Sequence, residues 1–264
     1  MELSIEKISK LFKNGGQIHT VLKDIGFTVQ EGQFVTLLGP SGCGKTTLLT
    51  IIAGFQKATA GVVKLNNTVV TKPGPERGFV FQDYALFPWM TVRDNILFPM
   101  KQQHVPGEER EKRLQELLTM AQLKGKEKLY PAQLSGGMKQ RTAVIRALAC
   151  NPKVLLMDEP LGAIDHQMRQ IMQEELEVLW LKDRTTVIMV THDVEEAIYL
   201  SDRVIVMSTE EGRIIEDLEV KLDRPRSRKS KKYAEYKDYL NDLLRTALNG
   251  PESNKDIEKV CAVI

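Results

Sequence analysis

The chain has 264 residues, enough for one large domain or two domains of ordinary size. Its 37 Lys and Arg residues against 35 Asp and Glu leave a formal charge of +2, which does not favour a dedicated nucleic-acid binder. Apolar runs such as Phe34 to Leu38 and Val187 to Val190 are far shorter than the ~20 residues of a membrane-spanning helix.

The cysteines and the amino terminus both favour a cytoplasmic protein. The three cysteines, Cys43, Cys150 and Cys261, form no CxxC pair, which argues against a disulfide framework and against a zinc site. The amino terminus lacks the basic start and apolar middle of a secretory signal. We therefore expect the chain to stay in the compartment where it is made.

The first elements expected along the chain are an antiparallel pair of strands and an α/β unit. Residues Leu3 to Ile8 and Ile25 to Val29 alternate apolar and polar side chains, with a turn at Lys13 to Gly16 between them. The compact apolar run Gln33 to Leu38 ends in glycine and precedes Lys45 to Ala53, which predicts a buried strand, a tight loop and a helix.

The second half of the chain predicts a largely parallel sheet. Buried strands are expected at Val154 to Asp158, Thr185 to Val190 and Arg203 to Met207. Helices are expected between them, at Gln167 to Leu181 and Val194 to Leu200. Alternation of strands and helices is typical of a parallel core, so the fold class expected is α/β.

Two other regions differ in character from this core. Between about 87 and 150 the strand signals stop, and Leu114, Leu117 and Leu118 recur at helical spacing, which predicts a helical subdomain. From Asp223 to residue 264 the chain becomes basic and polar before a terminal helical stripe from Tyr236 to Ala247. We divide the chain into a main domain over 1–222 and a tail over 223–264. We expect the basic stretch of the tail to be a solvated charge run rather than a dock for a partner or an anionic membrane.

A glycine-rich loop carries the strongest motif. It has the pattern of a glycine, four residues and then Gly-Lys-Ser/Thr, between a predicted strand and a predicted helix. Glycines let backbone N–H groups converge on phosphate oxygens, and the following helix points its positive end at the same charge. Lys45 is expected on the β and γ phosphates of ATP, and the Thr46 hydroxyl on Mg²⁺. The loop consists of Gly39, Pro40, Ser41, Gly42, Cys43, Gly44, Lys45 and Thr46, followed by Thr47.

Two acids end a later strand. Asp158 and Glu159 follow Val154 to Met157, at the sheet edge where α/β folds bind ligands. Asp158 is expected to hold Mg²⁺, and Glu159 to act as general base for the attacking water. The alternative is that both acids merely cap a following helix.

A second glycine motif begins a helix expected over Lys139 to Ala149. Ser135 is a good N-cap, and Gly136 and Gly137 follow it, so this helix terminus is also open to phosphate. Taken alone, the motif is only a cap with a turn.

Taken together, these motifs resemble the ATP-binding subunits of ABC transporters. The phosphate loop, Gln82, Leu134 to Gly137, the pair Asp158 and Glu159, Asp165 and His192 occur in that family's order and approximate spacing, from Phe12 to about Met207. The resemblance implies a RecA-like P-loop NTPase core with an antiparallel β subdomain and a helical subdomain carrying the signature motif. It also implies that two subunits pair head to tail, so that Ser135, Gly136 and Gly137 of one complete the ATP site of the other.

The resemblance assigns further roles residue by residue. Phe12 is expected to stack on the adenine, and Gln82 to reach Mg²⁺ and the attacking water. His192 is expected to steady the γ phosphate, and Asp165 to contact the opposite subunit. The alternatives are that Phe12 is core, that Gln82 is an exposed strand end and that His192 is structural. Three departures from the family pattern remove no group needed for chemistry. They are Phe12 in place of tyrosine, Met138 in place of glutamine, and the segment Leu161 to Ile164.

The resemblance also indicates partners and a location. The segments Leu86 to Trp89 and Asp223 to Arg226 look most like importer subunits for nitrate, sulfonate, taurine or bicarbonate. Such a subunit works on the cytoplasmic face of the membrane with integral membrane permease subunits, and indirectly with a solute-binding protein. Leu86, Phe87 and Trp89 either line a groove for the permease or close the helical subdomain's own core.

The alternative function is a soluble ABC-type ATPase that is not coupled to a transporter. Such proteins carry a long coiled coil within the ATPase or repeat the motif set, and each motif occurs once here. A small-molecule kinase would explain the phosphate loop but neither Leu134 to Gly137 nor His192.

Overall fold

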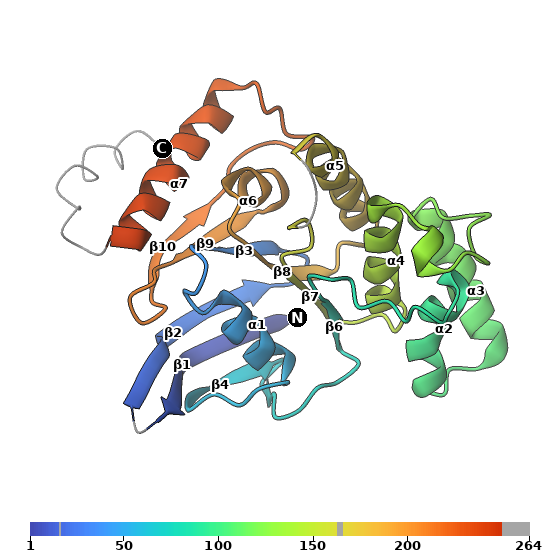
Figure 1. Cartoon of the computed structure of the whole chain (residues 1–264), viewed down its shortest axis with the longest axis horizontal. Helices are drawn as coiled ribbons and strands as arrows, with labels where there is room; N and C mark the ends of the chain where they lie inside the picture. The colour runs from blue at the N-terminus through green and yellow to red at the C-terminus, as the bar shows by residue number, and fades with distance from the viewer. Residues whose placement is uncertain (16, 163–165, 250–264) are drawn as a thin grey trace. The chain divides into compact units, whose positions relative to one another are not determined.

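The computed structural model describes residues 1–15, 17–162 and 166–249. They form two compact units, which are described separately: Met1–Pro73 with the chain from Ile188 onward, and Gly74–Val187 (Figure 1). No helix within the described ranges is long and apolar enough to cross a membrane.

An antiparallel sheet opens the first unit, as the alternating apolar pattern predicts. Strands β1 (Glu2–Asn14) and β2 (Gln17–Gln30) pair antiparallel, and the strand order is β2-β1-β4-β5. Leu3, Ile5 and Ile8, the apolar positions of the predicted strand, are buried, so this prediction is confirmed. Strands β4 (Ala60–Leu65) and β5 (Thr68–Val69) are additions to the prediction, because their mostly exposed residues give a weak alternation.

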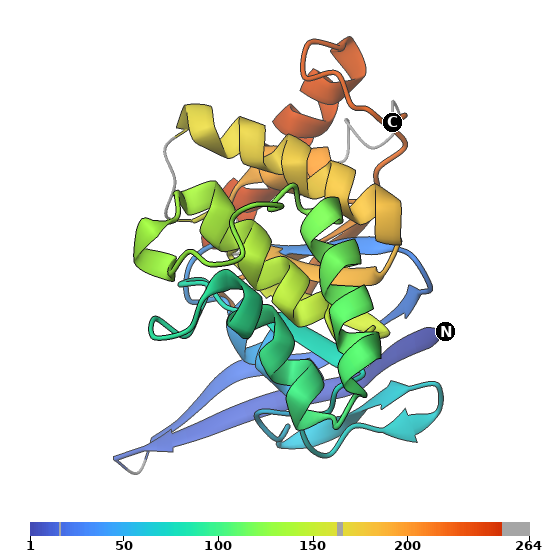
Figure 2. The same ribbon diagram turned by 90° about the vertical axis from the view of Figure 1, so that its right-hand side faces the viewer.

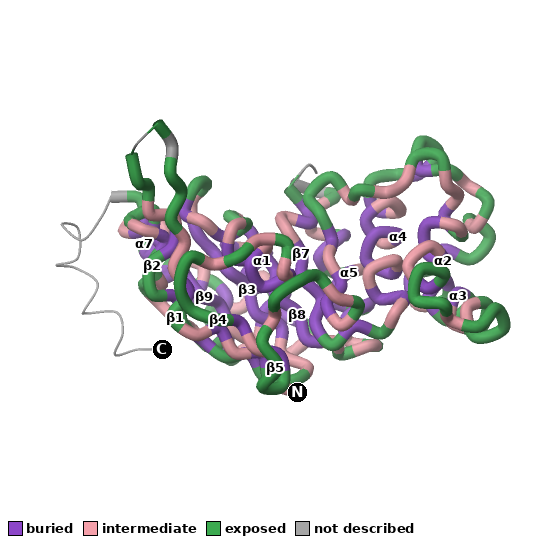
Figure 3. The backbone as a smooth tube through the Cα atoms, turned by 90° about the horizontal axis from the view of Figure 1, so that it is seen from below, coloured by how far each residue is buried: buried purple, intermediate pink, exposed green. Residues whose placement is uncertain are grey.

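A second set of strands in the first unit carries the phosphate loop. The order is β10-β9-β3-β8, and β3 (Phe34–Leu38) runs parallel to β9 (Arg203–Met207). Both are buried over most of their length, as the purple tube shows (Figure 3). Strand β8 (Thr186–Thr191) crosses the boundary between the units, and β10 (Ile214–Glu219), which is half exposed, is an antiparallel addition.

Three helices lie in the described part of the first unit. Helix α1 (Lys45–Ala53) follows the phosphate loop, α6 (Val194–Leu200) follows β8, and α7 (Lys231–Asn249) ends the described chain. All three lie where the sequence predicts helices. The stripe of α7 is buried at Tyr236 and Leu240, which shows that α7 is part of the folded core of this unit.

Helices dominate the second unit. Figure 2 shows α2, α3 and α4 packed together in the region that the sequence predicts to be helical. One strand pair belongs to the same unit, because β6 runs parallel to β7. The elements are β6 (Arg77–Val80), α2 (Val92–Gln102), α3 (Gly107–Met120), the 3-10 helix η1 (Pro131–Gln133), α4 (Gly136–Leu148), β7 (Val154–Asp158) and α5 (His166–Asp183).

Candidate nucleotide-binding site

The fold constrains the phosphate loop between β3 and α1 tightly. A Cβ atom added at Gly39 would lie 2.6 Å from the Met207 carbonyl oxygen and 2.8 Å from Cys43 Sγ. Gly42 and Gly44 have φ angles of 85° and 95°, in the left-handed region that favours glycine. Gly44 is the N-cap of α1 and has no side chain to occupy the helix N-terminus. The first N–H groups of α1 therefore remain oriented for an anion.

Lys45 is held across this loop. Its side chain is only 5% exposed, and Nζ donates to the carbonyl oxygens of Gly39 at 2.7 Å and Pro40 at 2.8 Å. The buried thiol of Cys43 lies 3.8 Å from the same nitrogen. Burial raises the pKa of Cys43, and the positive charge of Lys45 opposes that rise. The loop thus presents a preformed cation, while Thr46 faces solvent.

The other site residues of the first unit are accessible. Phe12 on β1 is 39% exposed, with Lys10 Nζ 4.9 Å from its ring centroid, so it is not a core residue. His192 is exposed and lies directly between β8 and α6. Strand β8 neighbours β3 in the sheet, and His192 follows β8 as the phosphate loop follows β3.

The second unit brings Gln82 and Glu159 together. A Cβ atom added at Gly162 would lie 3.4 Å from Glu159 Oε2 and 3.6 Å from Gln82 Nε2, so both groups face the same point. Asp158 ends β7 and is half-buried. Glu159 has a φ of 41°, a left-handed conformation that is rare for such a residue. Backbone strain of this kind is frequent at functional sites.

The signature segment of the second unit is open. Ser135 is the N-cap of α4, and its hydroxyl accepts a hydrogen bond from the Met138 N–H at 3.3 Å, as the sequence predicts. Ser135 and Gly136 are exposed, and a Cβ atom added at Gly136 would meet nothing within 4 Å. Within the unit, a larger side chain would fit at position 136, and the backbone conformation there does not require glycine.

A turn after Gln82 reveals a residue that the sequence analysis missed. Tyr84 and Ala85 have positive φ angles of 63° and 44°, and Arg146 donates hydrogen bonds to both of their carbonyl oxygens, at 2.9 and 2.6 Å. Burial lowers the pKa of Arg146, and Asp83 opposes that change. The sequence shows only an arginine within a predicted helix, and an arginine in a helix is too common to predict such a contact.

The aromatic segment after this turn divides between the two predicted alternatives. Phe87 is half-buried, with its ring 4.7 Å from Phe98 and 5.6 Å from Trp89, centroid to centroid. Leu86 is also half-buried. Trp89 is 70% exposed. Phe87 therefore belongs to an aromatic cluster of the helical unit, whereas Trp89 presents apolar area to solvent.

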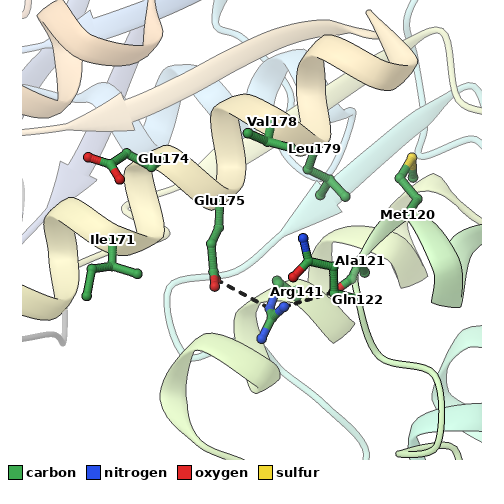
Figure 4. Close-up of a pocket in the computed structure, with 9 residues that line it drawn as sticks. All are labelled: Met120, Ala121, Gln122, Arg141, Ile171, Glu174, Glu175, Val178 and Leu179. Atoms are coloured by element: carbon green, nitrogen blue, oxygen red, sulfur yellow. Dashed lines mark hydrogen bonds and ion pairs between the residues drawn. The ribbon is translucent and has the colours of Figure 1, made fainter. Parts of the chain in front are cut away.

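A cavity of about 190 Å³ in the helical unit contains none of the predicted site residues. Figure 4 shows it between α4, α5 and the end of α3, with the Arg141–Glu175 ion pair at 3.4 Å beside Ile171 and Val178. Arg141 also donates to the Ala121 carbonyl at 3.0 Å. The guanidinium is thus engaged by the protein itself.

The predicted site residues are shared between the two units. Phe12, the phosphate loop and His192 lie in the first, whereas Gln82, the Asp158–Glu159 pair and Ser135 to Gly137 lie in the second. Asp165 lies outside the described residues.

A buried strand, a sterically fixed glycine loop, a lysine held above it and a helix define a P-loop nucleotide-binding protein. A family model described as ABC transporter matches residues 22–162, more than half of the chain. The chain belongs to the ABC transporter family, as one of its ATP-binding, ATP-hydrolysing subunits.

Known relatives extend this assignment. An uncharacterised ABC transporter ATP-binding protein of Methanocaldococcus jannaschii, MJ0412, is 45% identical and covers 93% of this chain and 92% of its own length. An aliphatic sulfonates import ATP-binding protein of Bacillus cereus is 44% identical, covering 89% and 92%. A nitrate import ATP-binding protein of Synechocystis is 42% identical, covering 93% and 96%.

Solved structures confirm the α/β cassette fold predicted from the sequence. The ATP-binding cassette MJ0796, in a dimeric post-hydrolysis state bound to ADP and Pi, matches with a TM-score of 0.71 and 34% identity. The match covers 83% of this chain and 99% of that one.

Proposed function

We propose that the chain powers the import of a small oxyanion, of the nitrate or sulfonate class, by closing an ATP-bound dimer against a membrane permease. The dimer is supported by the exposed Ser135–Gly136 segment. No contact within its own unit requires glycine at position 136. Glycine is the usual residue where a ligand must approach the backbone closely. The solute class is supported by the import proteins of Bacillus cereus and Synechocystis.

The phosphate loop supplies ATP binding in this proposal. The N–H groups at the start of α1 and the ammonium of Lys45 bind the triphosphate, and Lys45 exchanges its carbonyl partners for phosphate oxygens. Phe12, which is exposed, stacks on the adenine. The remaining loop residues, Pro40, Ser41 and Cys43 with Thr47, shape this cradle.

Hydrolysis uses residues of both units. Glu159 accepts the proton of the attacking water, and Gln82, which faces the same point, orients that water. His192 donates a hydrogen bond to the γ phosphate. Thr46, Gln82 and Asp158 offer hydroxyl, amide and carboxylate oxygens, the donor set that Mg²⁺ prefers. A Mg²⁺ ion held by these oxygens would neutralise charge on the transferred phosphoryl group.

The second ATPase subunit completes each site. Ser135, Gly136 and Gly137 of one subunit contact the ATP held by the other, and Asp165 contacts the opposite subunit. ATP binding energy then drives closure, and hydrolysis reverses it. An identical second copy satisfies this arrangement.

The exposed Trp89 supports a permease contact at the cytoplasmic face of the membrane. An exposed tryptophan beside the half-buried Leu86 and Phe87 has the composition of an interface anchor. We expect Trp89→Ala to reduce recovery of the permease when the chain is purified from membranes, while Phe55→Ala, which removes an exposed aromatic of the other unit, preserves it. Equal recovery with both variants would remove Trp89 from the contact.

The decisive experiment for the ATPase mechanism is Glu159→Gln. The amide retains the shape of the side chain but accepts no proton at neutral pH, so ATP turnover should fall by at least about 100-fold while ATP binding persists. Size-exclusion chromatography with ATP should then show a stable dimer. Lys45→Ala should bind no ATP and stay monomeric, and Glu109→Gln, an exposed acid on α3, should behave as the parent. Undiminished turnover by the Glu159→Gln protein would refute the assignment of the base.

A further inference from the structure

Three arginines of the basic stretch contact α6, contrary to the solvated charge run that the sequence predicts. The lysines of the stretch, Lys229, Lys231 and Lys232, are exposed as predicted. Arg226 donates hydrogen bonds from Nη1 to the carbonyl oxygens of Ile198 and Tyr199, the latter at 3.1 Å. Arg224 donates from Nη2 to the Leu200 carbonyl oxygen at 2.6 Å. The last carbonyls of a helix have no partner within the helix, so these two arginines act as its C-terminal cap. Positive charge at this end of a helix is also electrostatically favourable.

Burial shows that these contacts are structural. Arg226 is only 5% exposed. Arg224 also forms an ion pair with Asp202, at 2.9 Å. Arg228 places its guanidinium carbon 3.8 Å from the ring centroid of Tyr199, which lies on α6. A buried charge destabilises a fold strongly unless it is hydrogen-bonded. Burial of the Arg226 guanidinium therefore depends on its hydrogen bonds to α6.

Helix α7 contacts the other end of α6. The two helices belong to the same unit and pack against each other (Figure 1). The Tyr233 hydroxyl donates to the Glu195 carbonyl oxygen at 3.2 Å, and Lys237 forms an ion pair with the Glu195 carboxylate. Burial raises the pKa of Tyr233, which keeps the hydroxyl protonated as a donor. The tail therefore contacts both the first and the last turns of α6.

The first turn of α6 also fixes the residues on each side of His192. Thr191 Oγ1 donates to the Glu196 carboxylate and accepts from the Asp193 N–H at 3.1 Å. Asp193 Oδ1 accepts from the N–H groups of Glu195 at 2.8 Å and Glu196 at 3.2 Å. Since α6 has only seven residues, a length of about 10 Å, a change at its C-terminal end reaches the His192 backbone within two turns.

We infer that the tail is a positioning element for His192, and that Arg226 and Arg224 set the rate of ATP hydrolysis through α6 without contacting nucleotide. This inference rests on the role of His192 in the proposed function. A helix of seven residues is marginal by itself, so its orientation depends on the groups that cap it. Any partner that displaces the tail from α6 therefore slows turnover, which makes this contact a point of regulation.

The test compares substitutions in the full chain. Arg226→Ala leaves the Ile198 and Tyr199 carbonyls without this donor, and we expect the turnover number to fall about tenfold while the KM for ATP changes by less than about twofold. Arg226→Lys retains the charge and should recover part of the loss. Arg245→Ala, which removes an exposed arginine of α7 that pairs with Asp242 on the same helix, should leave turnover unchanged. The imidazole NMR resonances of His192 should shift in Arg226→Ala and not in Arg245→Ala.

Two further variants separate the possible failures. Tyr233→Phe removes one hydroxyl contact with α6 and provides a milder test if Arg226→Ala does not fold. A His192→Ala protein that retains full turnover would overturn the role of His192 and the inference with it. If His192→Ala is inactive while Arg226→Ala and Tyr233→Phe keep normal turnover and unshifted His192 resonances, the inference alone is overturned.

Discussion

The two glycine motifs of this chain both begin a helix, yet the fold constrains them differently. In the phosphate loop, an extra Cβ at Gly39 or Gly44 would collide with neighbouring atoms at 2.6 to 2.9 Å. In the signature segment, Gly136 has open space, and the nearest atom to an added Cβ at Gly137 is at 3.8 Å, an ordinary contact. The first motif is therefore fixed by packing within its unit, and the second is not.

In our proposal, these two motifs are unequal parts of an ATP site, and the difference in packing separates their roles. The phosphate loop is preorganised before nucleotide arrives, with Lys45 already held by two carbonyl oxygens. Preorganisation lowers the entropic cost of binding. Ser135 and Gly136 of the signature segment are exposed, and in our proposal they contact nucleotide only when a second subunit brings ATP to them. Substitution of a packed glycine in the phosphate loop should therefore lower stability strongly. Substitution in the signature segment should lower activity more than stability.

The largest effect on stability is expected for Gly39→Ala. The new methyl group meets the backbone oxygen of Met207, which moves only if β9 moves, so unfolding should become easier by about 3 kcal/mol. Gly136→Ala should change the free energy of unfolding by about 0.5 kcal/mol or less, because the site is open and alanine favours helix. Urea unfolding of both variants measures this contrast. Equal losses at the two positions would show that the signature segment is packed as tightly as the phosphate loop.

A smaller stability effect, with a separate loss of activity, is expected for Ser135→Ala. Loss of this N-cap should cost about 1 kcal/mol, which leaves a domain of ordinary stability folded at 25 °C. ATP turnover should nevertheless fall at least about tenfold, because the hydroxyl is proposed to contact the ATP of the opposite subunit.

Thr91→Ala is the matched control for this substitution. Thr91 caps α2 in the same unit by accepting from the Asp94 N–H at 3.1 Å, so its loss should cost similar stability. Turnover should remain at the parent level. A loss of turnover equal to that of Ser135→Ala would attribute both effects to folding of the helical unit.

Elements with a strong local signal in the sequence were predictable, and elements with a weak signal were not. Buried runs and helix starts were predictable: β3, α1 and the Ser135 cap lie where the apolar pattern and capping chemistry place them. Strands β4 and β10 were not, because most of their residues are exposed or only half-buried, which leaves little apolar contrast. The candidate site residues were chosen through motif order, which the sequence displays directly, and their roles remain predictions. Their assembly across the two units remains a prediction.

The supporting contacts of the site were beyond sequence reasoning. Arg226 lies in a run of basic residues, and its burial depends on α6, 26 or more residues earlier in the chain. Arg146 binds the turn at Tyr84 and Ala85, about 60 positions away. Arginine side chains are mostly exposed in proteins. These two are engaged because they donate hydrogen bonds to backbone carbonyl groups that are distant in the sequence.

The smallest expected effect is on the alkylation rate of Cys43, which tests whether the phosphate loop stays closed in solution. Cys43 is only 1% exposed, and its burial raises the pKa of the thiol, so the thiolate that reacts with alkylating agents is scarce at neutral pH. We expect iodoacetamide to label Cys43 slowly at pH 7, more slowly than the half-exposed Cys150, with a rate that rises only above the pH range in which ordinary thiols titrate. Mass spectrometry of the folded protein across this pH range, with unfolded protein as the reference, gives both rates. Labelling of Cys43 at the unfolded rate near pH 8 would mean that the loop opens readily and that Lys45 is not held in place before ATP binds.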